Sequence, residues 1–334
     1  MFARRVFCVA GVAVLAGTAC TMQRRVPESS RLSMDDHMAG MSAADMAAPR
    51  IVRRAADQGV PGLPPSASTA KARIAASPRH GEWVKIAWEP GAKDSLMAWI
   101  VYPETTRPHT PVVVVVHEIF GLSTWIRGVA DQVAADGFIA IAPDLLSRVR
   151  GGASADELSS DSAVKLIRGV APAERNMGIT AAANYAMGQP SAEHKYAVMG
   201  FCWGGYTTWG YATNEGTSGF SGGVAFYGLP YMDAAPNNAM PNADSLAKIK
   251  VPMMLLSGSK DARIGAAMPA VDSAMRAMHK DYFGKNYDGA IHGFARAQDD
   301  PKAQRDTVEE QANLSAIKDA WPRTVAFLKK HLGV

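Results

Sequence analysis

A cysteine in the second half of the chain lies in a segment with the pattern of a nucleophile elbow. Residues 200–205 read Gly-Phe-Cys-Trp-Gly-Gly, between a predicted strand at 196–199 and a helical stretch. In such an elbow the nucleophile occupies a strained strand-to-helix turn, and small flanking residues let the two backbones approach. The positive end of the helix dipole also favours a thiolate. The pattern predicts Cys202 as a nucleophile; the alternative is a buried cysteine that packs as a small apolar side chain.

An acidic residue and a histidine follow in the chain order that this kind of active site requires. Asp261 lies in a Gly/Ser loop after the predicted strand 253–257, and His292 follows the predicted strand 281–287. An unperturbed thiol, with a pKa of about 8.5, is mostly protonated at neutral pH, so it needs a base. We expect His292 to act as the base and Asp261 to orient it, although an aspartate in such a loop can also be an ordinary turn residue.

Acyl transfer to a thiol also needs donors that stabilise the negative oxygen of the tetrahedral intermediate. Behind a nucleophile elbow, one donor is the backbone N–H of the residue after the nucleophile, which is Trp203 in this chain. The other comes from the loop after the third strand, where Ile119 lies. We expect the N–H groups of Trp203 and Ile119 to form the oxyanion hole.

Strands and helices alternate from about Glu82 onward, which predicts the α/β class. The valine-rich run 112–117 is typical of a strand buried on both faces, whereas the first two strands flank a turn and form an antiparallel pair. We expect an α/β-hydrolase fold, with a mostly parallel eight-stranded sheet and helices on both faces. The predicted strands are residues 83–88, 96–102, 112–117, 138–142, 196–199, 222–226, 253–257 and 281–287. A last helix is expected at 312–332, kinked or divided at Pro322.

From about Glu82 to Leu332 the sequence resembles the dienelactone hydrolase family (carboxymethylenebutenolidases). The resemblance rests on His117-Glu118-Ile119-Phe120-Gly121, the elbow at 200–205, Asp261, and His292-Gly293-Phe294-Ala295-Arg296. It implies the α/β-hydrolase fold and hydrolysis of an ester or lactone, with neither a cofactor nor a metal ion.

The resemblance also assigns roles to residues around the elbow. Glu118 would accept a hydrogen bond from the resting thiol and help to generate the thiolate when substrate arrives; the alternative is a structural glutamate held by backbone N–H groups. Arg296 would hold a substrate carboxylate by two hydrogen bonds, and Phe120 would line the substrate pocket. The family has a second such arginine between the fourth strand and the elbow. Four arginines are available for that role: Arg148, Arg150, Arg168 and Arg175.

Aromatic side chains near the elbow are candidates for the apolar walls of the pocket, or for plain core. They are Phe120, Trp203, Tyr206 and Tyr227. A further segment, 231–246, is rich in Asn, Pro and Met and is expected to form a rim over the pocket.

The N-terminus has the layout of an export signal over residues 1–20. Two arginines precede the short apolar stretch 6–16, and small residues then lead to Cys20. The arginine pair resembles a twin-arginine signal, and the small residue before Cys20 resembles a lipoprotein cleavage site. We expect an exported protein, periplasmic or anchored in the bacterial envelope through a lipid on Cys20. Cys202 is then the thiol that remains in the folded body.

Between this signal and the folded body, residues 21–78 are rich in Ala, Ser, Pro and Met, which predicts a flexible tether. The folded domain would span 79–334. The cluster Met34-Asp35-Asp36-His37-Met38 could bind copper, because thioether and imidazole groups suit that metal, but a solvated linker is the simpler interpretation.

The charge balance excludes some classes of partner. The formal net charge is +4, from 35 Lys+Arg against 31 Asp+Glu, and the body carries no Lys/Arg-rich block, so no nucleic-acid partner is indicated. No run of about 20 apolar residues follows the signal, which argues against a transmembrane segment. The expected partner is a small ester or lactone that can carry a carboxylate.

Two other functions would use the same features. A general esterase or thioesterase would share the triad and differ in its substrate pocket. A non-catalytic binding protein of the envelope would use the pocket without chemistry, with copper at the N-terminal Met/His cluster. Turnover that depends on Cys202 separates both enzymes from the binding protein.

Overall fold

Strands buried on both faces form the centre of the sheet. All seven residues of β3 (Thr110–Val116), all five of β4 (Ile139–Pro143) and all six of β9 (Met253–Gly258) are buried. Their apolar sequences suit this position, because parallel strands covered by helices expose neither face to water. At the edge of the sheet, β10 (Tyr282–Tyr287) has one buried residue.

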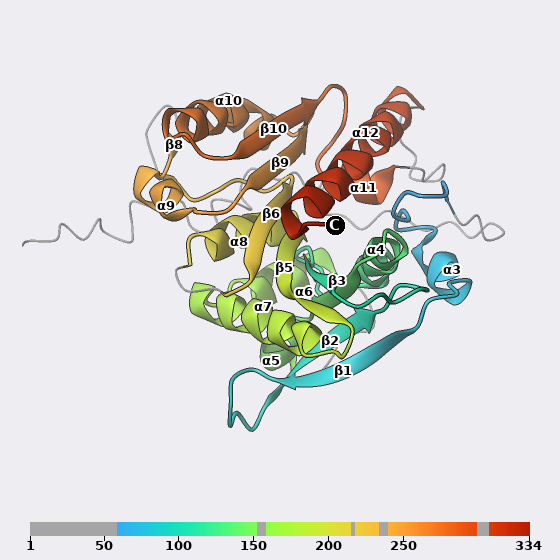
Figure 1. The fold of residues 1–334 in the computed structure, drawn as a ribbon. Coiled ribbons are helices and arrows are strands. Elements are labelled where there is room, and N and C mark those ends of the chain that lie inside the picture. The colour runs from blue at the N-terminus through green and yellow to red at the C-terminus, as the bar shows by residue number, and fades with distance from the viewer. Residues whose placement is uncertain (1–58, 152–157, 215–217, 234–239, 299–306) are drawn as a thin grey trace, which may run out of the picture.

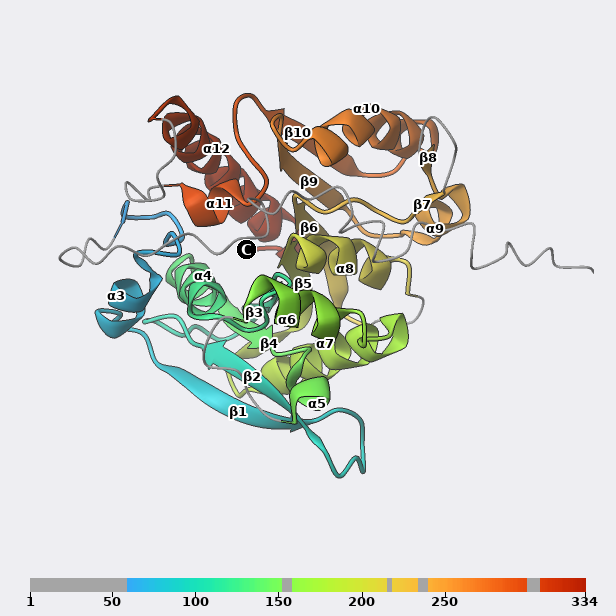
Figure 2. The ribbon, with the colours of Figure 1, turned by 180° about the vertical axis from the view of Figure 1, so that it is seen from behind.

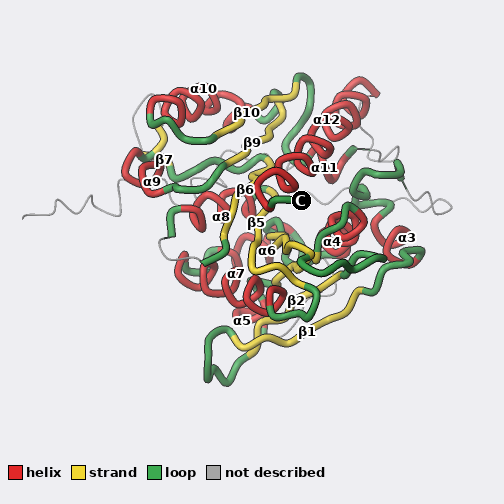
Figure 3. The backbone as a smooth tube through the Cα atoms, viewed as in Figure 1, coloured by secondary structure: helices red, strands yellow, loops and turns green. Residues whose placement is uncertain are grey.

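The computed structural model describes residues 59–151, 158–214, 218–233, 240–298 and 307–334. Strands and helices alternate along most of the described chain (Figure 3). The other strands are β1 (Gly81–Ala87), β2 (Ser95–Val101), β5 (Ala192–Phe201), β6 (Phe220–Phe226), β7 (Met232–Asp233) and β8 (Met240–Pro241). The helices are α3 (Ala70–Ala75), α4 (Thr124–Ala135), α5 (Ser147–Arg150), α6 (Ser160–Ile167), α7 (Pro172–Met187), α8 (Trp203–Ala212), α9 (Ala243–Lys248), α10 (Ala262–Ala277), α11 (Phe294–Ala297) and α12 (Thr307–Leu332).

Eight strands pair in the order β1-β2-β4-β3-β5-β6-β9-β10. β2 pairs antiparallel with both β1 and β4, and the pairings from β4 to β10 are parallel. The sheet twists from β1 at the bottom of Figure 1 to β10 at the top. The predicted α/β-hydrolase fold, with its antiparallel opening pair, is confirmed.

Helices cover both faces of this sheet, as Figures 1 and 2 show from opposite sides. Two neighbouring glycines of β6 demonstrate it: a Cβ on Gly222 would lie 3.2 Å from Phe327 of α12, and one on Gly223 would lie 3.1 Å from Thr208 of α8. Successive residues of a strand face opposite sides of the sheet. α8 and α12 therefore cover opposite faces.

α8 occupies the most enclosed position in the described fold. All ten of its residues are buried, which suits its apolar and small side chains, because a helix that is apolar all round belongs in a core. It follows β5 directly, so its N-terminus lies at the carboxyl edge of the parallel strands. Binding and catalytic residues collect at that edge.

The expected tether is wrong at its C-terminal end, because residues 59–78 pack on the domain. Leu63 is 6% exposed, Ser66 is fully buried, and α3 packs against α4. The indole N–H of Trp125 donates to the carbonyl of Pro65 at 2.8 Å. This segment has the composition of a linker, yet its apolar and proline residues cover α4 in the structure. The expected signal at 1–20 with Cys20, and residues 21–58 with the Met/His cluster, lie outside the described residues.

The expected division of the last helix is also wrong. α12 runs from Thr307 to Leu332 through Pro322, which lies in its interior. A proline removes one helical hydrogen bond, and this loss is offset where the helix is held by packing. Next to it, Trp321 is buried and donates its indole N–H to Asp136 at 2.9 Å.

Candidate active site

Cys202 occupies a strained turn between β5 and α8. Its φ is +54° and its ψ is −114°, a backbone conformation that residues with a side chain seldom adopt. A Cβ on Gly200 would lie 2.1 Å from the carbonyl oxygen of Gly204, so strand and helix meet at a distance that only glycine permits. The predicted elbow geometry is present, and the Cys202 side chain is 2% exposed.

The predicted acid and base lie together. Nδ1–H of His292 donates to Oδ2 of Asp261 at 2.5 Å, and both side chains are buried. The other oxygen of Asp261 accepts the N–H of Ile264 at 3.2 Å, because Asp261 caps the N-terminus of α10. Both carboxylate oxygens are therefore occupied, and the carboxylate is held in one orientation toward the imidazole.

The charge of His292 is set by its neighbours. Burial disfavours the imidazolium, but negative charge at Cys202 and Asp261, together with hydrogen bonds to both, raises the pKa of His292 well above its usual value. The sulfur of Cys202 and the carboxylate of Asp261 thus act on one imidazole.

A buried ion pair lies at the same edge of the sheet. Nη1 of Arg296, from α11, lies 3.1 Å from Oε2 of Glu118, which follows β3, and both side chains are about 5–6% exposed. The Arg296 guanidinium stacks 4.8 Å above the ring of Phe120. Phe120 is thereby placed as a platform for Arg296. Three residues that the sequence singles out for substrate contact or activation lie together.

The two expected oxyanion donors lie on neighbouring strand ends, since β3 and β5 are paired in the sheet. Trp203 is the first residue of α8, and the first N–H groups of a helix have no partner within it. Ile119, in the loop after β3, is fully buried. A Cβ on Gly204 would lie 2.3 Å from the carbonyl oxygen of Val116, so the start of α8 rests on the end of β3.

The comparisons with known proteins agree with this geometry. A model of the dienelactone hydrolase family matches residues 96–332, which is most of the chain. The chain belongs to the dienelactone hydrolase family. It is therefore a hydrolase.

Relatives and solved structures give the same result for this dienelactone hydrolase family member. An Escherichia coli protein named "Putative carboxymethylenebutenolidase" is 27% identical over 274 residues, which cover 81% of this chain and 96% of that protein. A Methylorubrum extorquens protein of the same name is 31% identical over 213 residues, covering 63% and 71%. The crystal structure of a "Putative Dienelactone Hydrolase" from Klebsiella pneumoniae superposes with a TM-score of 0.56 at 25% identity, covering 75% of this chain and 98% of that one.

Among the four arginines available as the family's second clamp, the structure leaves two candidates, Arg175 and Arg150. Arg175 is 5% exposed, and its guanidinium lies 5.7 Å from the ring centre of Trp203 and 5.3 Å from that of Tyr206, both on α8. Its Nη1 is buried and makes no hydrogen bond within the described residues. Position in the sequence did not distinguish it from the other three, because the distance from α7 to α8 depends on packing.

Two of the other three arginines fit the role less well. Arg148 pairs with the exposed Asp94 at 2.5 Å and lies over Trp88. Arg168 is exposed near the end of α6. Arg150 is half-buried beside Gly121, and its Nη1, like that of Arg175, is buried without a hydrogen bond in the described structure.

Tyr227, which the sequence singled out only as a wall or core aromatic, lies beside His292. It follows β6 at a φ of +40°, and its ring centre lies 4.9 Å from that of His292. Burial, and then the charges of Glu118 and Cys202, raise the pKa of Tyr227 well above its usual value. Its hydroxyl makes no hydrogen bond within the described residues. A positive φ at a tyrosine is a tertiary feature, so no sequence pattern indicates it.

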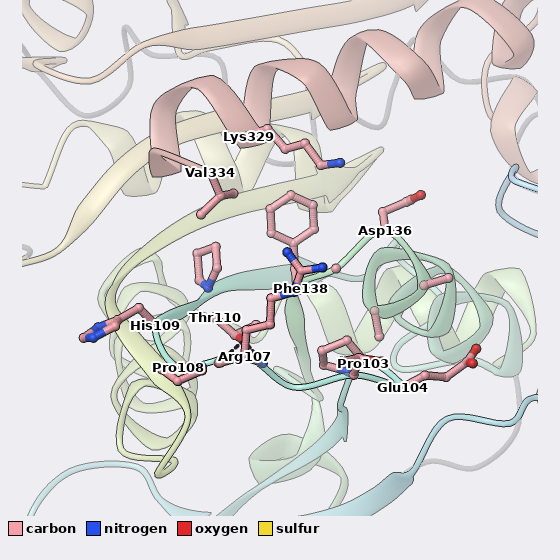
Figure 4. Close-up of a pocket in the computed structure, with 15 residues that line it drawn as sticks. Pro103, Glu104, Arg107, Pro108, His109, Thr110, Asp136, Phe138, Lys329 and Val334 are labelled. Atoms are coloured by element: carbon pink, nitrogen blue, oxygen red, sulfur yellow. Dashed lines mark hydrogen bonds between the residues drawn. The ribbon is translucent and has the colours of Figure 1, made fainter.

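The cavity shown in Figure 4 contains none of the predicted site residues. It has a volume of about 540 Å³, is lined by Arg107, Phe138 and Lys329, among others, and opens at the amino-terminal edge of the parallel strands, opposite Cys202. Within the described residues, no group of three or more His, Cys, Asp or Glu side chains has the arrangement of a metal site. None of the described helices is both long and apolar enough to cross a membrane.

Proposed function

We propose that this dienelactone hydrolase family member cleaves an ester or lactone through a covalent acyl-cysteine on Cys202. The observation that carries the proposal is the position of Cys202 on a turn of positive φ, beside His292, whose Nδ1–H donates to Asp261 at 2.5 Å. A cysteine that serves as an apolar packing residue needs neither the strained turn nor an imidazole oriented by a carboxylate.

In the first half-reaction, the Cys202 thiolate attacks the carbonyl carbon, and the N–H groups of Ile119 and Trp203 stabilise the resulting oxyanion. The intermediate collapses, the bond to the leaving group breaks, and the His292 imidazolium gives its proton to the departing alkoxide or enolate. Neutral His292 then takes a proton from water, whose oxygen attacks the acyl-cysteine. The second intermediate releases the acid and restores the thiolate and the imidazolium.

Glu118 supports the formation of the thiolate. It accepts a hydrogen bond from the thiol of the resting enzyme, and the proton passes to His292 when substrate arrives. In the structure Glu118 is paired with Arg296 at 3.1 Å. A substrate carboxylate competes with Glu118 for Arg296, so substrate binding is coupled through this ion pair to the transfer of the thiol proton to His292.

The proposed substrate is a small ester or lactone that carries a carboxylate. Three donor groups support this class: Arg296, Arg175 and the hydroxyl of Tyr227. Nη1 of Arg175 and the Tyr227 hydroxyl are both buried and make no hydrogen bond in the described structure. Arginine binds a planar carboxylate with two parallel hydrogen bonds. We further propose that the protein is exported, on the strength of the signal-like residues 1–20, and that Cys20 is a candidate for lipid attachment.

The test is turnover of p-nitrophenyl acetate and of a cis-dienelactone by the wild type and by Cys202→Ala. We expect the substitution to abolish turnover of both, because one partner of a nucleophile–base unit typically contributes orders of magnitude to the rate. Mass spectrometry of an acid-quenched reaction should find the acyl group on Cys202 in the wild type.

Cys202→Ser is the matched control, since it nearly preserves the size of the side chain and replaces the thiol with a weaker nucleophile. Wild-type rates in Cys202→Ala would refute the covalent mechanism. A wild type with an intact thiol and no turnover of either compound would favour the binding-protein alternative, and equal rates on neutral and anionic esters would favour a general esterase.

A further inference from the structure

A second histidine is buried at the same edge of the sheet and takes no part in the proposed proton transfers. His117 is fully buried at the end of β3, directly before Glu118. Its Nδ1 lies 2.6 Å from the carbonyl oxygen of Glu118, and the N–H of Leu145 donates to its Nε2 at 3.1 Å. A carbonyl only accepts and an amide N–H only donates, so these partners fix a neutral imidazole with its proton on Nδ1.

His117 contacts the ends of three neighbouring strands. His117 directly follows β3, Leu145 lies two residues beyond the end of β4, and Trp203 lies two residues beyond the end of β5. The imidazole stacks on the indole of Trp203, with ring centres 5.3 Å apart and planes inclined by 18°. His117 thus contacts Trp203, which supplies one expected oxyanion donor. It also contacts Glu118, which directly precedes Ile119, the residue that supplies the other.

The hydrogen bond to Glu118 has a consequence for the next residue. The carbonyl of Glu118 and the N–H of Ile119 belong to one planar peptide unit and point in opposite directions. A donor that holds this carbonyl therefore fixes the direction of the Ile119 N–H. It also polarises the peptide unit, which makes the N–H a stronger donor.

The surroundings keep the imidazole neutral. Burial lowers the pKa of His117; the charge of Asp144, 3.9 Å from Nε2, and the Glu118 carbonyl oppose this effect, while the charge of Arg150 adds to it. A neutral ring is required, because a proton on Nε2 would face the N–H of Leu145.

We propose that His117 is a positioning residue for the oxyanion hole: it orients the N–H of Ile119 through the Glu118 carbonyl and supports Trp203 by stacking. The inference rests on the proposed function, since it concerns the same acyl transfer. It goes beyond that function in assigning His117 a part in aligning both donors, together with the N–H of Gly121, which also donates to the Glu118 carbonyl at 3.3 Å.

Two substitutions separate the hydrogen bonds from the ring. H117Q keeps a donor and an acceptor about as far apart as the two ring nitrogens, and H117F keeps a stacking ring without either. We expect kcat for p-nitrophenyl acetate to fall about 10–100-fold in H117F, with KM within about 3-fold. The oxyanion develops in the transition state and is absent from the bound substrate, so its loss of support slows the reaction without weakening substrate binding. In H117Q, kcat should stay within about 3-fold of wild type.

A readout of the thiolate distinguishes positioning from general damage. Alkylation of Cys202 by iodoacetamide needs the thiolate but forms no oxyanion, so its rate should be unchanged in H117F. Affinity for a trifluoromethyl ketone, which forms a tetrahedral adduct with a negative oxygen, should fall in proportion to kcat/KM.

Wild-type kcat in H117F would overturn the inference, as would a parallel loss of alkylation and turnover. If H117F does not fold, H117Q decides, because a folded H117Q with a loss of more than about 10-fold contradicts the role of the two hydrogen bonds. Failure of the proposed function is detected by a different experiment, because it would give wild-type turnover in Cys202→Ala.

Discussion

At the scale of single residues, two buried guanidinium groups near the elbow differ in their partners. Arg296 is paired with Glu118 and stacked on Phe120, so its charge is already compensated in the resting structure. Arg175 lies over two aromatic rings of α8, and its Nη1 is buried without a hydrogen bond in the described structure. A buried charged donor with an unused hydrogen is costly unless a ligand completes it. Arg175 is therefore the sharper probe of carboxylate recognition.

Arg175→Met keeps the packing over the aromatic rings and removes the charge. We expect KM for a carboxylate-bearing ester to rise about 10–100-fold, since a hydrogen bond to a charged group contributes about 1.5–3 kcal/mol. KM for p-nitrophenyl acetate should stay within about 2-fold. Steady-state kinetics on both esters tests this, with Arg148→Met as the control, because Arg148 pairs with exposed Asp94. An equal loss on both esters would show that Arg175 has a packing role only.

At the scale of elements, the loop that carries His292 is held by two neighbours. The N–H of Lys260 donates to the carbonyl of Ala290 at 2.9 Å, which ties this loop to the one that carries Asp261. On the other side, Oδ1 of Asn313, fully buried on α12, accepts the N–H of Ile291 at 3.0 Å. The distance between base and acid thus depends on α12, a helix that contributes no predicted catalytic side chain.

Asn313→Ala should lower both stability and turnover. Leaving the partly buried N–H of Ile291 without its acceptor costs about 1–3 kcal/mol, which corresponds to a fall in Tm of about 2–10 °C for a domain of this size. We expect kcat to fall about 10-fold because the imidazole loses part of its support. Calorimetry and kinetics check both values. Gln311→Ala, at an exposed position of the same helix, should change neither, and wild-type kcat in Asn313→Ala would show that the loop is held without this bond.

At the scale of the whole molecule, residues 59–69 join distant parts of the chain. The side-chain amide of Gln298 donates to the carbonyl of Pro64 at 2.8 Å, and the N–H of Ala67 donates to the carbonyl of Arg296 at 3.0 Å. On α4, a Cβ at Gly128 would lie 2.6 Å from the ring of Pro65. This segment therefore links α4 to the turn that carries Arg296. It is part of the hydrolase domain and supports the backbone of Arg296, the residue proposed to bind the substrate carboxylate.

A comparison of two truncations measures this contribution. A chain that begins at residue 70 should unfold about 5–10 °C below one that begins at residue 59, because it exposes Trp125 and the face of α4 that residues 59–69 cover. KM for an anionic ester should also rise, since Arg296 loses its backbone support. Thermal unfolding and steady-state kinetics of both chains give the answer. Identical Tm values would mean that residues 59–69 contribute no net stability.

The fold and the order of the central site residues were predictable from local sequence. Apolar runs such as 112–116, alternating with helical stretches, indicate buried parallel strands, and chain order then places Cys202, Asp261 and His292 after β5, β9 and β10. These inferences succeed because strand burial and the elbow depend on residues close together in the chain. They require no knowledge of which helix packs on which.

The tertiary structure decided the features that depend on packing between distant segments. Arg175 differs from Arg148, Arg150 and Arg168 because α7 lies against α8, and the proline-rich residues 59–69 belong to the domain because α4 offers them an apolar surface. Pro322 remains within a helix because buried neighbours hold it. The positive φ of Tyr227 and the tautomer of His117 likewise arise from partners far away in sequence. Local propensity is a weak guide wherever long-range contacts supply most of the free energy.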